Sequence, residues 1–240
     1  MLSKRFIAVV LLLVAVCAVR FTHKSNSLAI GAFSPIISNI FELMLMHNLQ
    51  SYLQSDNLQF GFKKYSSGAH AMFALRNVVD YYLFPAPQLL RVHSISRRFL
   101  IVYVDHYALL NLLNGQKKTT CFINIMLSWF QCCISTVRWG NALSSLFIIR
   151  AGVPQCGLLS PFLFAVYRDV LIIRLRESGY GCKFLQQYFG CILYADDISL
   201  LSHSANAMLS VLKICEQFAA DFDVKFNTMK SMVMRIGDRF

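Results

Sequence analysis

FGCILYADDISLL, residues 189–201, is the stretch that decides the fold. Two apolar runs, 189–193 and 198–201, enclose the adjacent carboxylates of Asp196 and Asp197. Because burying unpaired charge is costly, the two aspartates are expected where the chain turns out of a sheet. The stretch therefore predicts the two strands of a β-hairpin with both carboxylates at its turn.

The two carboxylates at this turn have the chemistry of a magnesium site. Mg²⁺ is a hard cation that prefers oxygen ligands and keeps water molecules for substrate phosphates. A polymerase uses such ions in pairs to hold the attacking and leaving oxygens of an in-line displacement. An ordinary Asp-rich hairpin turn has the same composition, and the dipeptide alone favours that plainer alternative.

A helix with clear boundaries precedes the hairpin. Ser160 can cap its beginning, and Pro161 suits the first position, where a missing N–H costs nothing. Arg174 and Arg176 complement the C-terminal dipole, and Gly179 can supply the left-handed residue that ends the helix.

The periodicity of the remaining sequence adds further helices and strands. Apolar residues at helical spacing predict helices over residues 38–52, 68–82, 121–130 and 204–222, and Ser204 can cap the last of these. Strand-like runs predict a hairpin over residues 135–149 and a last strand pair over 224–227 and 232–236. Residues 84–99 show no clear period. The sum is an α+β fold in which helices pack on an antiparallel sheet.

The composition is that of a basic, folded protein. The 240 residues are 56% hydrophobic, which excludes a disordered chain, and their formal net charge is +11. This charge indicates an anionic partner such as nucleic acid or a membrane surface, and a basic surface that serves only solubility is the alternative. The eight cysteines show neither a disulfide framework nor zinc spacing, and they fit free thiols in a reducing compartment.

The amino terminus has the layout of a secretory signal. Lys4 and Arg5 precede an unbroken apolar run over residues 6–19, in which Ala18 is small enough to precede a cleavage site. The run is short for a membrane span, which needs ~20 residues. A buried strand or helix and mispredicted coding sequence are the alternatives. Residues 1–33 are therefore an apolar leader of open status, and a membrane is a partner only if this run is used.

Segments on both sides of the hairpin resemble a known family. AGVPQCGLLSP lies before the aspartates at residues 151–161, and FNTMKS follows them at 226–231. In order and spacing these motifs resemble the reverse transcriptase family, and the match to polymerases of non-LTR (LINE-type) retrotransposons is close. Shorter matching segments lie at residues 34–42, 58–64, 105–110, 137–140, 163–167 and 178–182.

The resemblance implies a right-hand polymerase fold with fingers and palm. It makes residues 34–95 fingers-like and residues 96–240 palm-like, with the thumb missing. In such a palm Asp196 is a direct metal ligand with Asp197 beside it, the metal is Mg²⁺ or Mn²⁺, and Tyr194 lies near the primer end. The implied partners are an RNA template, a DNA primer and nucleotides, and no stable protein partner is inferred.

Five further residues take roles from the same resemblance. Gln155 and Gly157 would line the floor where the templating base and the incoming nucleotide pair. Lys230 would lie near the nucleotide phosphates and could act as a proton donor. Lys63 and Lys64 would face nucleic acid phosphates from the fingers, and a solvated basic face explains these two lysines equally well.

The first catalytic motif of the family is missing. That motif places a metal-binding Asp ten residues before a His that corresponds to His106 here, and the count falls on Ser96. We interpret residues 96–103 as translated out of frame: the family's codons for Lys-Ala-Phe-Asp-Arg-Val, when read one base along, can give Arg-Arg-Leu-Ile-Val, which is close to residues 97–102. Asp105 is the only acid nearby, and it fills a different position in the motif.

The sequence thus predicts an RNA-directed DNA polymerase fragment of retrotransposon origin that is inactive. The alternatives are a non-catalytic RNA-binding relic, a secreted or membrane-associated protein led by residues 1–18, and a chain that does not fold stably. The resemblance implies a cytoplasmic or nuclear location, whereas a functional signal segment would imply export.

Overall fold

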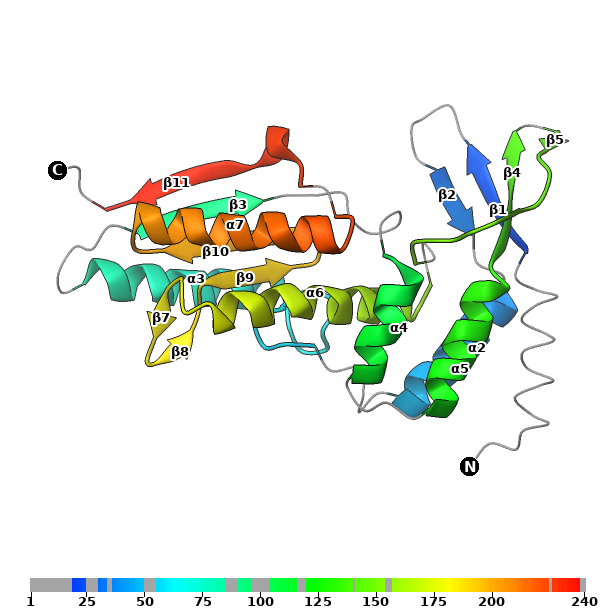
Figure 1. Ribbon diagram of the computed structural model, residues 1–240, viewed down its shortest axis with the longest axis horizontal. Helices are drawn as coiled ribbons and strands as arrows, with labels where there is room; N and C mark the ends of the chain where they lie inside the picture. Colours follow the sequence, from blue (N-terminus) through cyan, green and yellow to red (C-terminus); the bar gives the residue numbers. More distant parts are fainter. Residues whose placement is uncertain are drawn as a thin grey trace. The chain divides into compact units, whose positions relative to one another are not determined.

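The computed structural model describes residues 19–24, 30–33, 36–49, 55–84, 90–95, 104–115, 120–139, 141–153, 157–224 and 226–237. The chain divides into two compact units, residues 1–54 with 100–167 and residues 55–99 with 168–240. Each unit has its own sheet and its own covering helices (Figure 1). The separate division into fingers-like residues 34–95 and palm-like residues 96–240 stays a prediction.

The second unit is built on a four-stranded antiparallel sheet that contains the predicted hairpin. The strand order is β11-β3-β10-β9. The strands are β3 (Leu90–Ile95), β9 (Cys191–Tyr194), β10 (Asp197–Ser202) and β11 (Met232–Ile236). Tyr194 pairs with Asp197 across the hairpin, so Ala195 and Asp196 alone form the turn. The hairpin and the strand over residues 232–236 are therefore confirmed.

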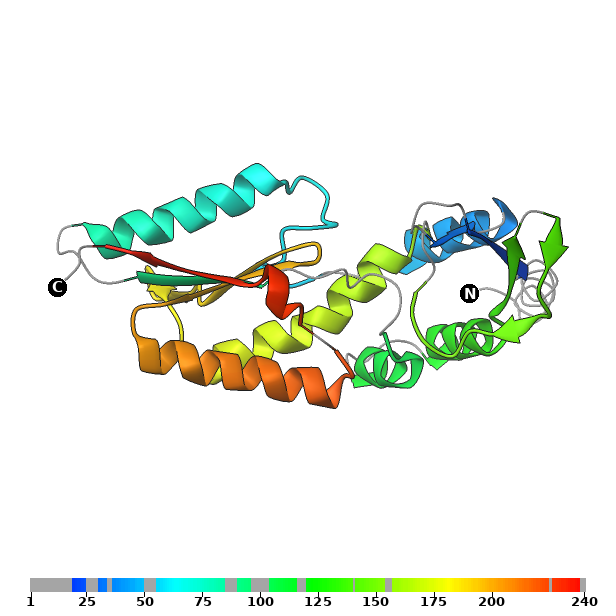
Figure 2. The same cartoon turned by 90° about the horizontal axis from the view of Figure 1, so that it is seen from above.

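Helices cover both faces of this sheet (Figure 2). α3 (Gly68–Leu83) lies on one face, and α7 (Ala205–Asp221) lies with the C-terminal part of α6 (Ser160–Glu177) on the other. Because side chains alternate along a strand, Ile192 packs with Val78 of α3, whereas the buried Leu193 points to the opposite face. Fully burying such a side chain is worth ~1.5–3 kcal/mol, so packing on both faces holds the sheet together.

The helix ends of this unit follow the sequence, and one predicted strand does not form. The hydroxyl of Ser204 accepts a hydrogen bond from Ala207 N at 3.1 Å and caps α7, and Gly179 follows α6 with a φ of +73°. The strand over residues 224–227 is wrong at its described residues. The Asn227 side chain instead accepts from Lys230 N at 3.3 Å and caps a 3₁₀ turn, η1 (Thr228–Lys230).

The first unit contains a five-stranded sheet. Its order is β2-β1-β4-β5, with β6 also paired to β4. The strands are β1 (Val19–Lys24), β2 (Ile30–Phe33), β4 (Ile134–Trp139), β5 (Ala142–Leu143) and β6 (Phe147–Ile148). Antiparallel pairing of β4 with β5 and β6 confirms the predicted hairpin. The parallel pairing of β1 with β4 was not predicted.

Three helices complete the first unit, and two of them confirm predicted helices. They are α2 (Ile36–Leu49), α4 (His106–Gly115) and α5 (Thr120–Gln131). Trp129 meets Phe41 edge-on with ring centroids 6.0 Å apart, and Phe130 stacks on His106 at 4.1 Å. Aromatic packing between helices therefore forms the centre of this core.

The start of α6 differs from its prediction. Ser160 is the first helical residue, and the carbonyl of Leu159 accepts the first helical bond, from Phe162 N at 3.1 Å. Ser160 Oγ is buried and has no hydrogen-bond partner among the residues that the structure describes. The buried carboxylate of Glu42 accepts from Leu159 N at 3.0 Å instead. The predicted Ser160 cap is therefore wrong, because a distant acid satisfies this helix end.

The status of the apolar leader stays a prediction. β1 and β2 lie in its C-terminal part, and residues 1–18 lie outside the described residues. Within the described part of the chain, no helix has both the length and the apolar character that a bilayer crossing requires.

Candidate functional site

The turn from Tyr194 to Asp197 is the candidate site, and β9 and β10 hold it at the end of their hairpin. Ala195 has a φ of +47°, a left-handed conformation that residues other than glycine adopt infrequently. Tyr194 and Asp197 are exposed, and Asp196 is half-buried. The structure thus brings three predicted site residues together, with two of them open to solvent.

A buried arginine lies against this turn. Arg168 of α6 is 2% exposed, and its Nη1 donates a hydrogen bond to the carbonyl oxygen of Ala195. Burial lowers the pKa of Arg168 to about 10, while the negative charges of Asp196 and Asp197 act in the opposite direction. The guanidinium therefore remains charged at neutral pH. The two carboxylates of the turn thus have a cation from α6 beside them.

The loop over residues 55–63 runs along the outer edge of β9. Phe60 N donates to the carbonyl of Leu193 at 2.8 Å, and Leu193 N donates to the carbonyl of Leu58 at 2.9 Å. Gly61 then reaches the turn so closely that an added Cβ would lie 2.2 Å from Ala195 N. The absence of a side chain at Gly61 is therefore what lets the loop lie against the turn.

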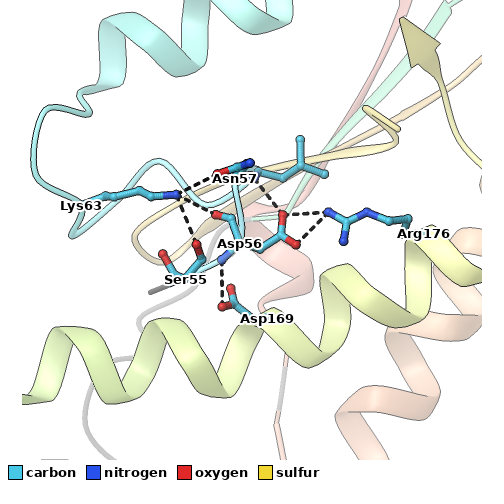
Figure 3. Close-up of polar contacts among 7 residues, drawn as sticks. Ser55, Asp56, Asn57, Lys63, Asp169 and Arg176 are labelled. Carbon is cyan, nitrogen blue, oxygen red and sulfur yellow. Dashed lines mark hydrogen bonds and ion pairs between the residues drawn. The ribbon is translucent and has the colours of Figure 1, made fainter. Parts of the chain in front are cut away.

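An ion pair between Arg176 and Asp56 joins this loop to α6 (Figure 3). The guanidinium of Arg176 donates from Nη2 to both carboxylate oxygens of Asp56, at 2.8 and 2.7 Å. The Lys63 ammonium donates to the carbonyls of Ser55 and Asp56, each at 3.2 Å, and to Asn57 Oδ1 at 3.4 Å. The Lys63 charge is thus engaged within the loop.

Asp169 lies beneath the same loop and is almost completely buried. Its Oδ2 accepts from Asp56 N at 2.9 Å, and its Oδ1 has no partner among the residues that the structure describes. Burial raises the pKa of Asp169 to about 7, against the opposing effect of the Asp56 N–H bond, and the nearby Asp56 carboxylate raises it further. Asp169 is therefore partly protonated near neutral pH.

For the other predicted site residues, the structure describes no contact with the Tyr194–Asp197 turn. Gln155 lies outside the described residues, and Gly157 is buried in the first unit. Lys64 is exposed where the 55–63 loop ends, and Lys230 is exposed at the end of η1. Their roles in binding nucleic acid and nucleotides stay predictions.

Arg168, Asp169 and Asp56 are the residues that sequence reasoning missed. Arg168 and Asp169 were visible as two adjacent charges inside the run FLFAVYRDVLII, residues 162–173. Charges within a buried helical run are rare unless they are paired, so this dipeptide was a usable indication. Asp56 offered no such pattern, because its partners Arg176 and Asp169 lie far away in sequence.

The residues at the turn do not fit a pair of divalent ions. Within the described ranges, no group of three or more His, Cys, Asp and Glu side chains could hold a metal ion. The turn offers the carboxylates of Asp196 and Asp197, and the Arg168 guanidinium beside them repels a further cation. The binding of Mg²⁺ or Mn²⁺ at this turn stays a prediction.

Comparison with known protein families shows to which family this sequence belongs. Residues 88–237 match the model of the family described as reverse transcriptase (RNA-dependent DNA polymerase). The chain belongs to the reverse transcriptase family. No curated protein sequence matches it.

Solved telomerase structures share the fold. Telomerase from Candida tropicalis in complex with a TWJ fragment of telomeric RNA superposes with a TM-score of 0.61 at 12% identity, over 83% of this chain and 34% of that chain. Apo telomerase from the same organism gives 0.56 at 12% identity, over 82% and 36%. Telomerase from Candida albicans, also with a TWJ fragment, gives 0.52 at 14%, over 82% and 33%. The chain spans about a third of each.

At these identities the likeness is one of fold. The predicted α+β architecture, with the fingers and palm of a right-hand polymerase, is confirmed by the mixed helices and antiparallel sheet and by these structures. The Tyr194–Asp197 hairpin lies within residues 88–237, the part of the chain that matches the reverse transcriptase family.

Replacing Gly61 with Ala tests the close approach of the loop to the turn. The new Cβ would meet the backbone of Ala195, which cannot rotate away, so Gly61→Ala is expected to destabilise the protein by about 1–3 kcal/mol or more. Gly115→Ala is the control, because nothing lies within 4 Å of the added Cβ at the end of α4. Urea unfolding measures both variants, and equal stabilities would contradict the described contact.

Replacing Asp169 with Asn tests its burial through pH. The folded-state pKa of about 7 lies above the ordinary 3.8, so the folded protein binds the proton more tightly. The cost of ionising Asp169 therefore grows between pH 4 and 7 and is complete above pH 7. Asp169→Asn is expected to gain on the order of 2 kcal/mol relative to the parent between pH 5 and 8.

Asp80→Asn, which removes an exposed carboxylate on α3, is the control for this pH effect. Its stability relative to the parent is expected to stay constant over the same range. A constant difference for Asp169→Asn as well, in thermal unfolding at several pH values, would show that Asp169 is not desolvated.

Proposed function

We propose that this chain is a fingers-and-palm fragment of a non-LTR retrotransposon reverse transcriptase that has lost polymerase activity. The family assignment rests on residues 88–237. The finer assignment to the non-LTR kind is supported by the order and closeness of the motifs at residues 34–42, 58–64, 151–161 and 226–231.

The pairing of β3 is the observation that carries the loss of activity. β3 lies between β10 and β11, and its Ile95 pairs with Ile198, the residue after Asp197. β3 therefore ends at Ile95, opposite the residue after Asp197, and Ser96, the next residue in the sequence, stands where the family has its first metal-binding Asp.

Asp105, the acid near position 96 in the sequence, already accepts other hydrogen bonds. The Asp105 carboxylate accepts from Tyr107 N at 2.6 Å and from Ala108 N at 2.9 Å, and its carbonyl accepts from Leu109 N at 3.0 Å. These are the contacts of a helix N-cap, and they stabilise the start of α4. This engagement supports the view that Asp105 does not replace the missing carboxylate.

Loss of that carboxylate removes the electrostatic basis of the reaction. Phosphoryl transfer depends on cations that neutralise charge on the transferring group, and little other covalent chemistry falls to the protein. Two carboxylates beside a guanidinium do not provide a site for paired cations. We therefore assign no polymerase step to this chain as its sequence stands.

Binding of RNA without catalysis is the second candidate function, and the exposed end of the 55–63 loop favours it. Lys64 is exposed and Tyr65 is 99% exposed directly after it. A cation beside an open aromatic ring suits a phosphate and a stacked base of single-stranded nucleic acid. The net charge of +11 supports this binding, and two of the similar telomerases were solved with an RNA fragment.

The proposed location is the cytoplasm or the nucleus. Cys182, Cys191 and Cys215 are free thiols, and all three are buried. Buried free thiols suit a reducing compartment. Export led by residues 1–18 remains the alternative, and an intact Met1 on the mature protein would argue against it.

Primer extension on an RNA template tests the loss of activity. With Mg²⁺ or Mn²⁺, the purified chain is expected to extend the primer no more than Asp196→Ala does, because the first metal-binding position carries a serine. Circular dichroism verifies that both proteins are folded. Extension that disappears in Asp196→Ala would overturn the proposal, since the metal site would then be functional.

RNA binding tests the second function separately. Fluorescence anisotropy in EDTA is expected to show affinity that falls as salt rises from 50 to about 200 mM, as it does for contacts to phosphates. Lys64→Ala is expected to lower the slope of log affinity against log salt by about 1, whereas Lys213→Ala on α7 leaves it unchanged. Salt-independent binding, or binding lost in Asp196→Ala, would exclude this function.

A further inference from the structure

Arg168 carries a positive charge in the buried interior of the protein, where an unpaired charge is unfavourable. It is 2% exposed and lies on α6 in the otherwise apolar run that precedes and follows Arg168-Asp169. A buried guanidinium is stable only if anions and hydrogen-bond acceptors replace the water that it has lost. The partners of Arg168 therefore determine what it does.

One hydrogen-bond partner of Arg168 lies in the acidic turn. Arg168 Nη1 donates to the carbonyl of Ala195, the residue directly before Asp196. Among the charges near the guanidinium, those of Asp196 and then Asp197 favour its charged form most. The side chain thus reaches the turn from α6, directly beside the residue that carries the half-buried Asp196 carboxylate.

We propose that Arg168 is the resident cation of the turn: its guanidinium balances the Asp196 and Asp197 carboxylates, so that the turn is stable without a divalent ion and binds one poorly. Two adjacent carboxylates without a cation would repel each other at the end of a tight hairpin. A guanidinium fixed beneath the turn removes this repulsion permanently. It also repels any metal ion that approaches the same oxygens.

The effect of Arg168 on the turn is separate from the loss of activity proposed at Ser96. An aspartate at position 96 would add a ligand but would leave the guanidinium in place. The charge balance of the turn can therefore be tested by unfolding and by metal binding, without an activity assay.

The first test measures, in metal-free buffer, whether removing an aspartate charge from the turn raises or lowers the stability of the folded chain. Asp196→Asn in the full chain is expected to raise the unfolding equilibrium constant at least about tenfold, because it leaves a buried cation short of its main partner. Asp197→Asn is expected to have a smaller effect, since Asp197 is exposed. Adding Mg²⁺ to the parent is expected to leave its melting temperature unchanged.

The opposite sign would overturn the proposal. If the carboxylates mainly repel each other, Asp196→Asn in EDTA stabilises the chain, and Mg²⁺ stabilises the parent. In the double variant Arg168→Met with Asp196→Asn, both charges are gone, so its loss is expected to be smaller than the sum of the two single losses. Additive losses would show that the two groups do not interact.

The second test is direct metal binding, followed by electron paramagnetic resonance of free Mn²⁺. Arg168→Met is expected to bind Mn²⁺ at least about tenfold more tightly than the parent, because the repelling charge is removed. Arg168→Lys keeps the charge and is expected to resemble the parent. The gain is expected to vanish when Asp196→Asn is added to Arg168→Met, and equal Mn²⁺ affinity in the parent and in Arg168→Met would overturn the proposal.

Discussion

The contact between the Arg168 guanidinium and the Ala195 carbonyl is the interaction on which the site depends. It joins a buried helix to a two-residue turn that carries two carboxylates, and it does so inside one compact unit. A sheet end that concentrates negative charge needs a positive charge nearby, whether from a bound ion or from a side chain. In this chain the Arg168 side chain supplies that charge.

The 55–63 loop shows how the same helix supports the turn from its edge. Asp169 follows Arg168 directly and accepts a hydrogen bond from Asp56 N. Arg176, two turns further along α6, forms an ion pair with the Asp56 carboxylate. Gly61 then lies against Ala195. One face of α6 thus fixes both the turn and the loop beside it. The cost is a carboxyl at Asp169 whose pKa lies near 7, a burial that a purely structural core would avoid.

Much of this fold follows from local sequence. Apolar runs around Asp196 and Asp197 predicted the hairpin, and Ser204 and Gly179 marked helix boundaries because their chemistry acts within one turn. β3 was missed because residues 90–95, LRVHSI, mix polar and apolar side chains, and its strand character comes from pairing with β10 and β11. The Ser160 cap failed for a similar reason, since Glu42 from a distant helix accepts the hydrogen bond. The charge balance of the turn likewise depends on a contact between residues 168 and 195 that no local pattern encodes.

Crystals of the full chain grown with MnCl₂ test the central claim most directly, because anomalous scattering locates manganese independently of the protein density. We expect no manganese peak at the oxygens of Asp196 and Asp197, and the Arg168 guanidinium is expected to stay against the Ala195 carbonyl. A manganese ion bound by both aspartates, with Arg168 displaced from the turn, would contradict it.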